Sequence, residues 1–289
     1  MTGRTGIRLA GVSVDCRGRL LLDRIDLALE PGRTTVVVGP NGAGKTTLLK
    51  VLSGEIRPTR GTVLLDGRPL AEIGPRRLAA RRALLSQANE TAFGFTVRQL
   101  AGLGFRLLET PVPVPRRAVL VQKALDHVGL AGFEDREVGR LSGGERQRAH
   151  LARVLVQLWA AAGTGAGLLL LDEPTAAQDL VHQLRVLEIA RGHAEAGGTV
   201  CVVLHDLNWA AGIGDRMLVL SHGRIHSDGP PADVLTQAML ADVFGVDIRP
   251  CAVPPPGRPF IVPQLAGGRP SAGACPSLAN ERRAACISP

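Results

Sequence analysis

The residues from Thr34 to Thr47 read TTVVVGPNGAGKTT, an apolar run that passes directly into a glycine-rich segment. The run TTVVV is typical of a buried strand, and KTTLLKVLS, residues 45–53, is compatible with a helix that Gly54 ends. Between them, Gly39–Thr47 has the spacing G-x-x-x-x-G-K-[ST], in which glycines let backbone amides wrap phosphate oxygens. The strand, loop and helix together predict a nucleotide site in an α/β fold.

Every residue of this loop is a candidate nucleotide-binding residue. The set is Gly39, Pro40, Asn41, Gly42, Ala43, Gly44, Lys45, Thr46 and Thr47. The helix N-terminus adds a partial positive charge for the phosphates. We expect the Lys45 amine to reach the β- and γ-phosphates of ATP and the Thr46 hydroxyl to hold Mg²⁺.

A second apolar run, GLLLLDEPT at residues 167–175, ends on two adjacent carboxylates. A strand buried on both faces would leave them dry, at a cost of several kcal/mol each if nothing positive were near. The alternative is a pair of solvated acids at a strand end. With Lys45 in the chain, we expect Asp172 to hold Mg²⁺ through water and Glu173 to polarise the attacking water. Strand alternation predicts that the two side chains diverge.

Between these segments lies LSGGERQRAHLARVLVQLW, residues 141–159, in which Ser142 and Glu145 have the spacing of a helix capping box. The simpler interpretation is a well-capped helix. However, Gly143 and Gly144 leave backbone amides accessible at a positive helix end, which makes a second anion site. Two anion sites in one chain suggest a head-to-tail dimer in which each chain completes the other's site.

The remaining pattern alternates strands with helical stretches, as in a parallel α/β sheet. Residues 7–30 alternate like half-buried strands, and Asp66-Gly67 and His222-Gly223 are hairpin turn signals. The arginines Arg76, Arg77, Arg81 and Arg82 are interpreted as a solvated helix face, with anionic headgroups as the weaker alternative.

Composition narrows the class of protein. The net charge of +8 permits an acidic partner without requiring one, and the five cysteines form no C-x-x-C pair, which argues against a disulfide framework or a zinc site. Cys201 is expected in the core. The N-terminus lacks the apolar region of a signal peptide. The uncharged stretch at residues 154–171 contains three glycines and is read as helix end, loop and strand.

The chain resembles the ABC ATPases, the nucleotide-binding subunits of transporters, from about Ile7 to Val262. The motifs occur in the family's order: GPNGAGKTT, Gln87 in LLSQAN, LSGGERQR, LLLLDEP, Asp179 after the proline and His205 in VVLHDLN. The resemblance implies catalytic roles for Glu173 and His205, and Mg²⁺ coordination by Thr46, Gln87 and Asp172. It also implies that Ser142, Gly143, Gly144 and Glu145 act on the partner's ATP, with Asp179 coupling the halves.

The implied architecture is a P-loop α/β core with an N-terminal antiparallel β subdomain and a helical insert. We expect a nucleotide-binding domain at residues 1–250, with a helical subdomain at about 88–159. The extension at 251–289, rich in proline, glycine and alanine, is expected to be disordered from about 264.

Finer similarity is to the bacterial ATPases that import haem. It lies in AFGFTVRQLAGLG, RVLVQLW, DLVHQ, LHDLNWAA and PPADVLTQAMLADVFGV. Importers of ferric siderophores or cobalamin remain alternatives, and a non-transport ABC ATPase acting on nucleic acid is a further one. No long coiled-coil insertion or second nucleotide domain supports the latter, so no nucleic-acid partner is expected.

The resemblance implies a homodimer beneath two copies of a membrane permease, at the cytoplasmic face of the inner membrane, with an external haem-binding protein delivering cargo. The candidate permease contact is the surface around Gln87, Phe93, Phe95 and Arg98.

Three positions depart from the family pattern. In AAQD, residues 176–179, Gln178 stands where an apolar residue is usual and Ala176 where a hydroxyl residue is usual, which puts the packing between dimer halves in question. Cys16 stands where an aromatic residue commonly stacks on adenine, and Arg17 or Arg19 is a possible substitute.

Overall fold

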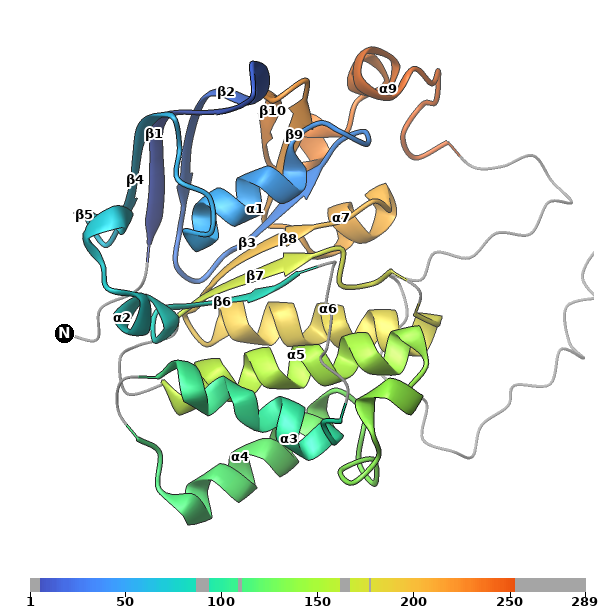
Figure 1. Cartoon of the computed structure of the whole chain (residues 1–289). Coiled ribbons are helices and arrows are strands. Elements are labelled where there is room, and N and C mark those ends of the chain that lie inside the picture. The colour runs from blue at the N-terminus through green and yellow to red at the C-terminus, as the bar shows by residue number, and fades with distance from the viewer. Residues whose placement is uncertain (1–5, 87–93, 109–110, 162–166, 177, 253–289) are drawn as a thin grey trace, which may run out of the picture.

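The computed structural model describes residues 6–86, 94–108, 111–161, 167–176 and 178–252. Two β-sheets and a group of helices form successive layers, with helix α1 between the sheets and the longer helices below the larger one (Figure 1). The strands are β1 Ile7–Cys16, β2 Arg19–Leu29, β3 Thr34–Val38, β4 Arg60–Leu65, β5 Arg68–Pro69, β6 Arg82–Leu85, β7 Leu168–Asp172, β8 Thr199–Val203, β9 Arg216–Ser221 and β10 Arg224–Gly229. The α-helices are α1 Lys45–Ser53, α2 Pro75–Ala79, α3 Val97–Gly102, α4 Val114–His127, α5 Gly143–Ala160, α6 Leu180–Glu195, α7 Leu207–Ile213, α8 Pro231–Val234 and α9 Gln237–Phe244.

The larger sheet has the strand order β10-β9-β3-β8-β7-β6, and all neighbours are parallel except β9 and β10. Every residue of β3, β7 and β8 is buried. Helices cover both faces, so these strands are continuous apolar runs rather than alternating ones. Cys201 lies buried in β8, as predicted.

The smaller sheet is antiparallel, with the order β2-β1-β4-β5. Both predicted hairpin turns are present. Asp66 and Gly67 have φ of 51° and 76° between β4 and β5, and His222 and Gly223 have φ of 50° and 74° between β9 and β10. Two successive left-handed residues are the geometry that these dipeptides favour.

Helix α1 lies between the two sheets and belongs to the core that joins them. Its Leu48, Leu49, Val51 and Leu52 are at most 1% exposed. Gly54 ends it in the left-handed conformation, as its place after the apolar run predicted. Burial of this apolar face fixes the start of α1, and with it the loop Gly39–Thr47, against the sheet.

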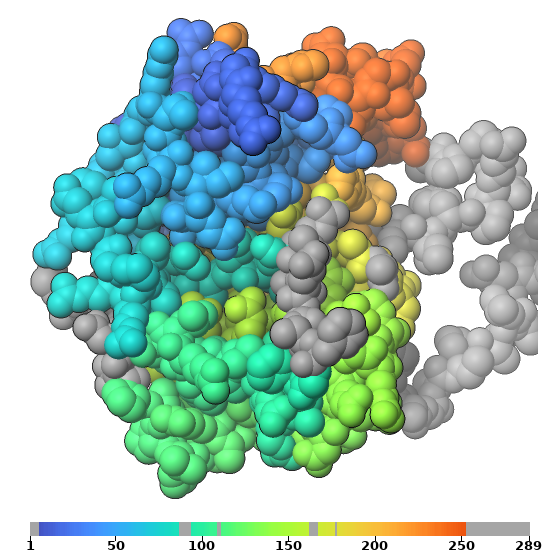
Figure 2. All heavy atoms as spheres, in the orientation of Figure 1, coloured from blue at the N-terminus to red at the C-terminus, as the bar shows by residue number. Residues whose placement is uncertain are grey.

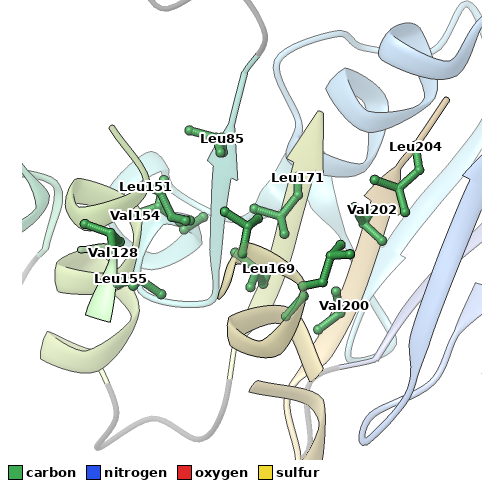
Figure 3. Close-up of a cluster of buried hydrophobic side chains, with 14 of the residues drawn as sticks. Leu85, Val128, Leu151, Val154, Leu155, Leu169, Leu171, Val200, Val202 and Leu204 are labelled. Carbon is green, nitrogen blue, oxygen red and sulfur yellow. The ribbon is translucent and has the colours of Figure 1, made fainter. Parts of the chain in front are cut away.

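The opposite face of the larger sheet packs against α5 and α6. Figure 3 shows leucine and valine side chains of α5, including Leu151, Val154 and Leu155, beside those of β6, β7 and β8. Helices α3 and α4 pack on α5 in turn, so the helical layer is anchored to the sheet mainly through α5.

The surface shows the same division, with the N-terminal strands on one side and the helices of residues 97–160 on the other (Figure 2). Among the described residues, no helix is long and apolar enough to cross a bilayer.

The prediction of one solvated arginine face is wrong for two of its four residues. Helix α2 ends at Ala79, because the apolar residues that follow enter the buried strand β6. Arg76 and Arg77 are exposed on α2, whereas Arg81 pairs with Asp66 and Arg82 is a half-buried residue of β6. The disorder expected from about residue 264 concerns a segment outside the described residues.

Candidate functional site

The loop Gly39–Thr47 joins the carboxyl end of β3 to the start of α1. Two of its glycines are required by close approach: a Cβ on Gly39 would collide with the Leu220 carbonyl oxygen, and one on Gly44 would lie 2.7 Å from the Leu21 carbonyl oxygen. Both have positive φ, 151° and 103°. Only glycine meets both demands, so the loop backbone lies close against β2 and β9.

Lys45 is the first residue of α1 and is only 6% exposed. Its amine donates to the carbonyl oxygens of Gly39, at 2.8 Å, and Pro40, at 2.9 Å, so the side chain spans the loop. Burial lowers the pKa of Lys45, and the nearby carboxylates of Glu173 and Asp172 oppose that shift. The structure thus brings together the cation and the acid pair that the sequence places far apart.

Asp172, the last residue of β7, is 2% exposed. Burial raises the pKa of this carboxyl, a hydrogen bond from the Thr46 side chain lowers it, and the charge of Glu173 raises it further. Its Oδ1 is buried with no hydrogen-bond partner. A buried carboxylate oxygen without a donor, beside a hydroxyl, fits a divalent cation that prefers oxygen ligands.

Glu173 is only 13% exposed at its side chain and contacts His205, whose Nε2 lies in hydrogen-bonding contact with Glu173 Oε1. The divergence of Asp172 from Glu173 was predicted from strand alternation, and that reason is wrong. Glu173 has φ of 50°, so the chain turns out of β7 in a left-handed conformation that directs the second carboxylate to His205.

His205 follows β8 and precedes Asp206, whose carboxylate accepts hydrogen bonds from the Asn208 and Trp209 amides and caps α7. The imidazole is half-exposed, so a ligand that reaches the Glu173 carboxylate also reaches His205. An imidazole and a carboxylate in contact can take and return a proton at one place.

The start of α5 has the predicted capping box. The Ser142 hydroxyl accepts from the Glu145 amide at 3.3 Å, and the Glu145 carboxylate accepts from the Ser142 amide at 2.8 Å. The latter hydrogen bond holds the pKa of Glu145 below its usual value. Ser142 and Gly143 are exposed, and no hydrogen bond or ion pair in the described part of the chain joins this helix start to Gly39–Thr47.

Asp179 caps α6 by accepting from the His182 amide at 3.0 Å and contacting the His182 ring at 2.7 Å. The backbone hydrogen bond from His182 lowers the pKa of this exposed carboxyl. Both contacts involve Oδ1, so one carboxylate oxygen is used within the chain, and the exposed position leaves the group accessible to a second molecule.

Three glutamines near Glu173 were missed as site residues. Gln147 of α5 donates to the Glu173 carbonyl oxygen at 3.0 Å, and Gln178 donates to Gln147 Oε1 at 3.1 Å. Gln183 of α6 donates to the Gln178 carbonyl oxygen at 3.1 Å. The available signal was Gln178, a polar residue at a position that is usually apolar.

The expected adenine contact lies beside the loop. Cys16 is exposed at the end of β1, and Arg17 has φ of 54° in the turn to β2. The strand β2 carries the Leu21 carbonyl that approaches Gly44, so this turn and the phosphate loop are neighbours. Gln87 and Phe93 lie outside the described residues; Phe95 packs on the core, and Arg98 is exposed and pairs with Asp135 at 3.5 Å.

Comparison with known proteins gives a consistent result. Residues 22–176 match the family model described as ABC transporter. The chain is 49% identical to the hemin import ATP-binding protein HmuV of Rhodopseudomonas palustris, covering 91% of this chain and 97% of that one. It is 46% identical to the protein of the same name from Myxococcus xanthus, covering 86% and 92%.

Solved structures share the fold. The nucleotide-binding region resembles a bacterial Atm1-family ABC exporter with ATP bound, with a TM-score of 0.69 and 27% identity over 81% of this chain and 40% of that one. A dimeric bacterial ABC transporter cassette gives a TM-score of 0.69 at 24% identity, covering 78% of this chain and 98% of that one.

Proposed function

This chain belongs to the ABC transporter family, and on that premise we propose that it is the ATP-hydrolysing, energy-coupling subunit of a bacterial hemin importer. The observation that carries the ATPase assignment is the buried pair of Lys45 and Asp172 beside the glycine loop, with the partly buried Glu173 next to them. The relatives named for hemin import support the cargo.

ATP would bind with its phosphates against the amides of Gly39–Thr47 and the N-terminus of α1. Lys45, already held across the loop, would neutralise the β- and γ-phosphates. Bound phosphate replaces lost hydration of the buried ammonium, which favours its charged form. The loop thus binds and orients the nucleotide before any bond breaks.

Mg²⁺ would be held by the Thr46 hydroxyl and the Asp172 carboxylate, with Gln87 as the further ligand that the family resemblance implies. The unpartnered Asp172 Oδ1 supports this assignment. Bound there, the ion would supply charge neutralisation between the phosphates.

Glu173 would accept a hydrogen bond from the attacking water and polarise it, taking its proton as the bond to the γ-phosphorus forms. His205 contacts the Glu173 carboxylate and would orient it while reaching the γ-phosphate from its half-exposed position. The leaving group, ADP, keeps its contacts to the loop.

Ser142 and Gly143, which are exposed, and the half-buried Gly144 and Glu145 would complete the ATP site of a second copy in a head-to-tail homodimer. Among the residues that the structure describes, no hydrogen bond or ion pair joins them to Gly39–Thr47, which supports that role. Asp179, exposed at the start of α6, would couple the two halves. ATP would close the dimer and hydrolysis would reopen it.

The partners would be two copies of an integral membrane permease, with an extracytoplasmic haem-binding protein acting on its far side. The subunit would lie peripherally at the cytoplasmic face of the inner membrane. The permease contact would include the exposed Arg98 at α3, together with Gln87, Phe93 and Phe95.

The direct test is reconstitution of this chain with a bacterial hemin permease in proteoliposomes. We expect ATP-dependent uptake of hemin. The Lys45→Ala variant, reconstituted with the same permease, is the control and should show no uptake. Uptake of a ferric siderophore or cobalamin, but not of hemin, would overturn the cargo assignment. ATPase activity that is stimulated by nucleic acid and needs no permease would overturn the transport assignment.

A further inference from the structure

The residue Glu173 sits in a backbone conformation that needs support from outside its strand. A non-glycine residue at φ of 50° costs roughly 1–2 kcal/mol relative to the right-handed region. Its carbonyl oxygen accepts from the Ala176 amide at 3.2 Å and from Gln147 Nε2 at 3.0 Å. Gln147 is thus the long-range side chain that holds this turn from helix α5.

The orientation of both amide groups in this cluster is fixed by their partners. The Glu173 and Pro174 carbonyl oxygens only accept, so the Gln147 nitrogen must face the first and the Gln178 nitrogen must face the second. Gln178 then reaches Gln147 Oε1 at 3.1 Å and the Pro174 carbonyl at 2.8 Å with one nitrogen. Replacing either glutamine would remove the hydrogen bond between the two side chains, and the remaining one would keep its bond to a backbone carbonyl.

The chain of contacts continues to the histidine side of the site. Gln183 Nε2 donates to the Gln178 carbonyl oxygen, and Gln183 Oε1 accepts from the Trp209 indole at 3.2 Å. Trp209 is buried in α7, the helix that begins directly after His205 and Asp206. The glutamines therefore connect the elements on both sides of the Glu173–His205 contact.

We propose that Gln147 and Gln178 are positioning residues for hydrolysis: they hold the turn at Glu173 and tie its carboxylate to the position of helix α5. This inference rests on the proposed role of Glu173. Because α5 begins at Ser142–Glu145, one turn before Gln147, any movement of that helix start is passed to the Glu173 backbone of the same chain. The two glutamines do not touch the nucleotide or the attacking water; Glu173 and His205 make those contacts.

The test replaces each glutamine by methionine, which keeps the length of the side chain and removes its hydrogen bonds. Gln122→Met is the matched control, since the hydrogen bonds of Gln122 on α4 within the described part of the chain go to the carboxylates of Asp126 and Glu134, outside the site. ATP affinity, kcat and thermal midpoint are measured for Gln147→Met, Gln178→Met and the double variant.

We expect kcat to fall about tenfold in each single variant, with ATP affinity within about twofold of the parent because Lys45 and its loop are untouched. The double variant should be no more than about threefold worse than either one, since both act through one turn. A parental kcat in Gln147→Met, an equal loss in Gln122→Met, or losses that multiply to about a hundredfold would overturn the proposal.

Hydrogen exchange separates this proposal from the ATPase assignment. In Gln147→Met, the amides of Glu173, Thr175 and Ala176 should exchange about tenfold faster than in the parent, whether or not the parent hydrolyses ATP. A parent without ATPase activity would count against the proposed function alone. Unchanged exchange in this turn would overturn the positioning role.

Discussion

Two helix starts in this chain are built in opposite ways. Gly44, the N-cap of helix α1, has no side chain to cap the helix, and the first helical residue, Lys45, is buried. Helix α5 begins at Ser142 with a complete capping box, and Ser142 is exposed. Both ends carry partial positive charge, yet only one leaves its amides without a side-chain acceptor.

The difference indicates where each start finds its ligand. At α1 the uncapped amides and the buried amine lie beside Asp172 in the same chain, and the apolar face of α1 supplies the stability that a cap would have added. At α5, the side chains of Ser142 and Glu145 already accept hydrogen bonds from amides of the helix start in the single chain. The Ser142 hydroxyl accepts one hydrogen bond there and can still donate its proton to a phosphate oxygen.

The largest effect should come from Glu173, which separates binding from hydrolysis at the α1 side. Glu173→Gln should retain ATP affinity and lose roughly 10²- to 10⁴-fold in turnover, because an amide cannot take the proton of water. The variant should accumulate as an ATP-bound dimer on size exclusion. Parental turnover would show that Glu173 is not the group that activates water.

Asp172→Asn should separate stability from activity at the same site. The raised pKa of Asp172 means that its ionised form is less favourable in the folded state than in the unfolded chain. That penalty is present above the folded-state pKa and is lost as the carboxyl becomes protonated at lower pH. The pKa shift therefore predicts that removing the charge raises the free energy of unfolding near pH 8, and by less near pH 4.

Urea unfolding of Asp172→Asn and the parent at the two pH values measures this effect. The matched control is Asp179→Asn: the pKa of Asp179 is lowered, so this substitution should not stabilise the protein at pH 8. A loss of stability in Asp172→Asn, or a gain that grows as pH falls, would contradict the burial argument. Its Mg²⁺-dependent hydrolysis should be lost in either buffer.

Ser142→Ala tests the self-satisfied start of α5. Removing the hydroxyl that caps the Glu145 amide should cost about 1 kcal/mol in the free energy of unfolding. ATP binding to the monomer should be unchanged, because no hydrogen bond or ion pair among the described residues joins this helix start to the phosphate loop. Weakened monomer binding of ATP would mean that the two regions communicate within one chain.

The smallest effect concerns the base. Cys16 offers little surface for stacking, and an aromatic partner contributes on the order of 1–3 kcal/mol where base stacking has been measured. We expect ATP and GTP affinities within about tenfold of each other in a Glu173→Gln background. Cys16→Tyr should tighten ATP binding. A strong ATP preference that this substitution leaves unchanged would place the base elsewhere.

Local pattern was sufficient for much of the fold. The apolar runs predicted β3 and β7, Gly54 predicted the end of α1, and the turn dipeptides predicted both hairpins. Each of these depends on residues close together in the chain: burial period, a left-handed cap or a two-residue turn. Such features can be predicted because the residues that determine them are those that form them.

The errors concern long-range contacts. Arg81 was placed on a solvated face because its partner, Asp66, becomes a neighbour only after β4 and β5 pair. The left-handed turn at Glu173 and its bond from Gln147 join residues 26 apart. Residue spacing placed Asp172 and Glu173 in the site, but tertiary packing decides how the second carboxylate is directed.

The most direct measurement mixes two inactive variants, Lys45→Ala and Ser142→Arg. Lys45→Ala lacks the phosphate-binding amine, and Ser142→Arg blocks the exposed start of α5 while leaving ATP binding to its own monomer intact. Each carries one damaged region, so a head-to-tail heterodimer has one composite site with both regions intact. We expect ATPase activity in the mixture above that of either variant alone; parental hydrolysis by Ser142→Arg by itself would contradict completion of the site by a second chain.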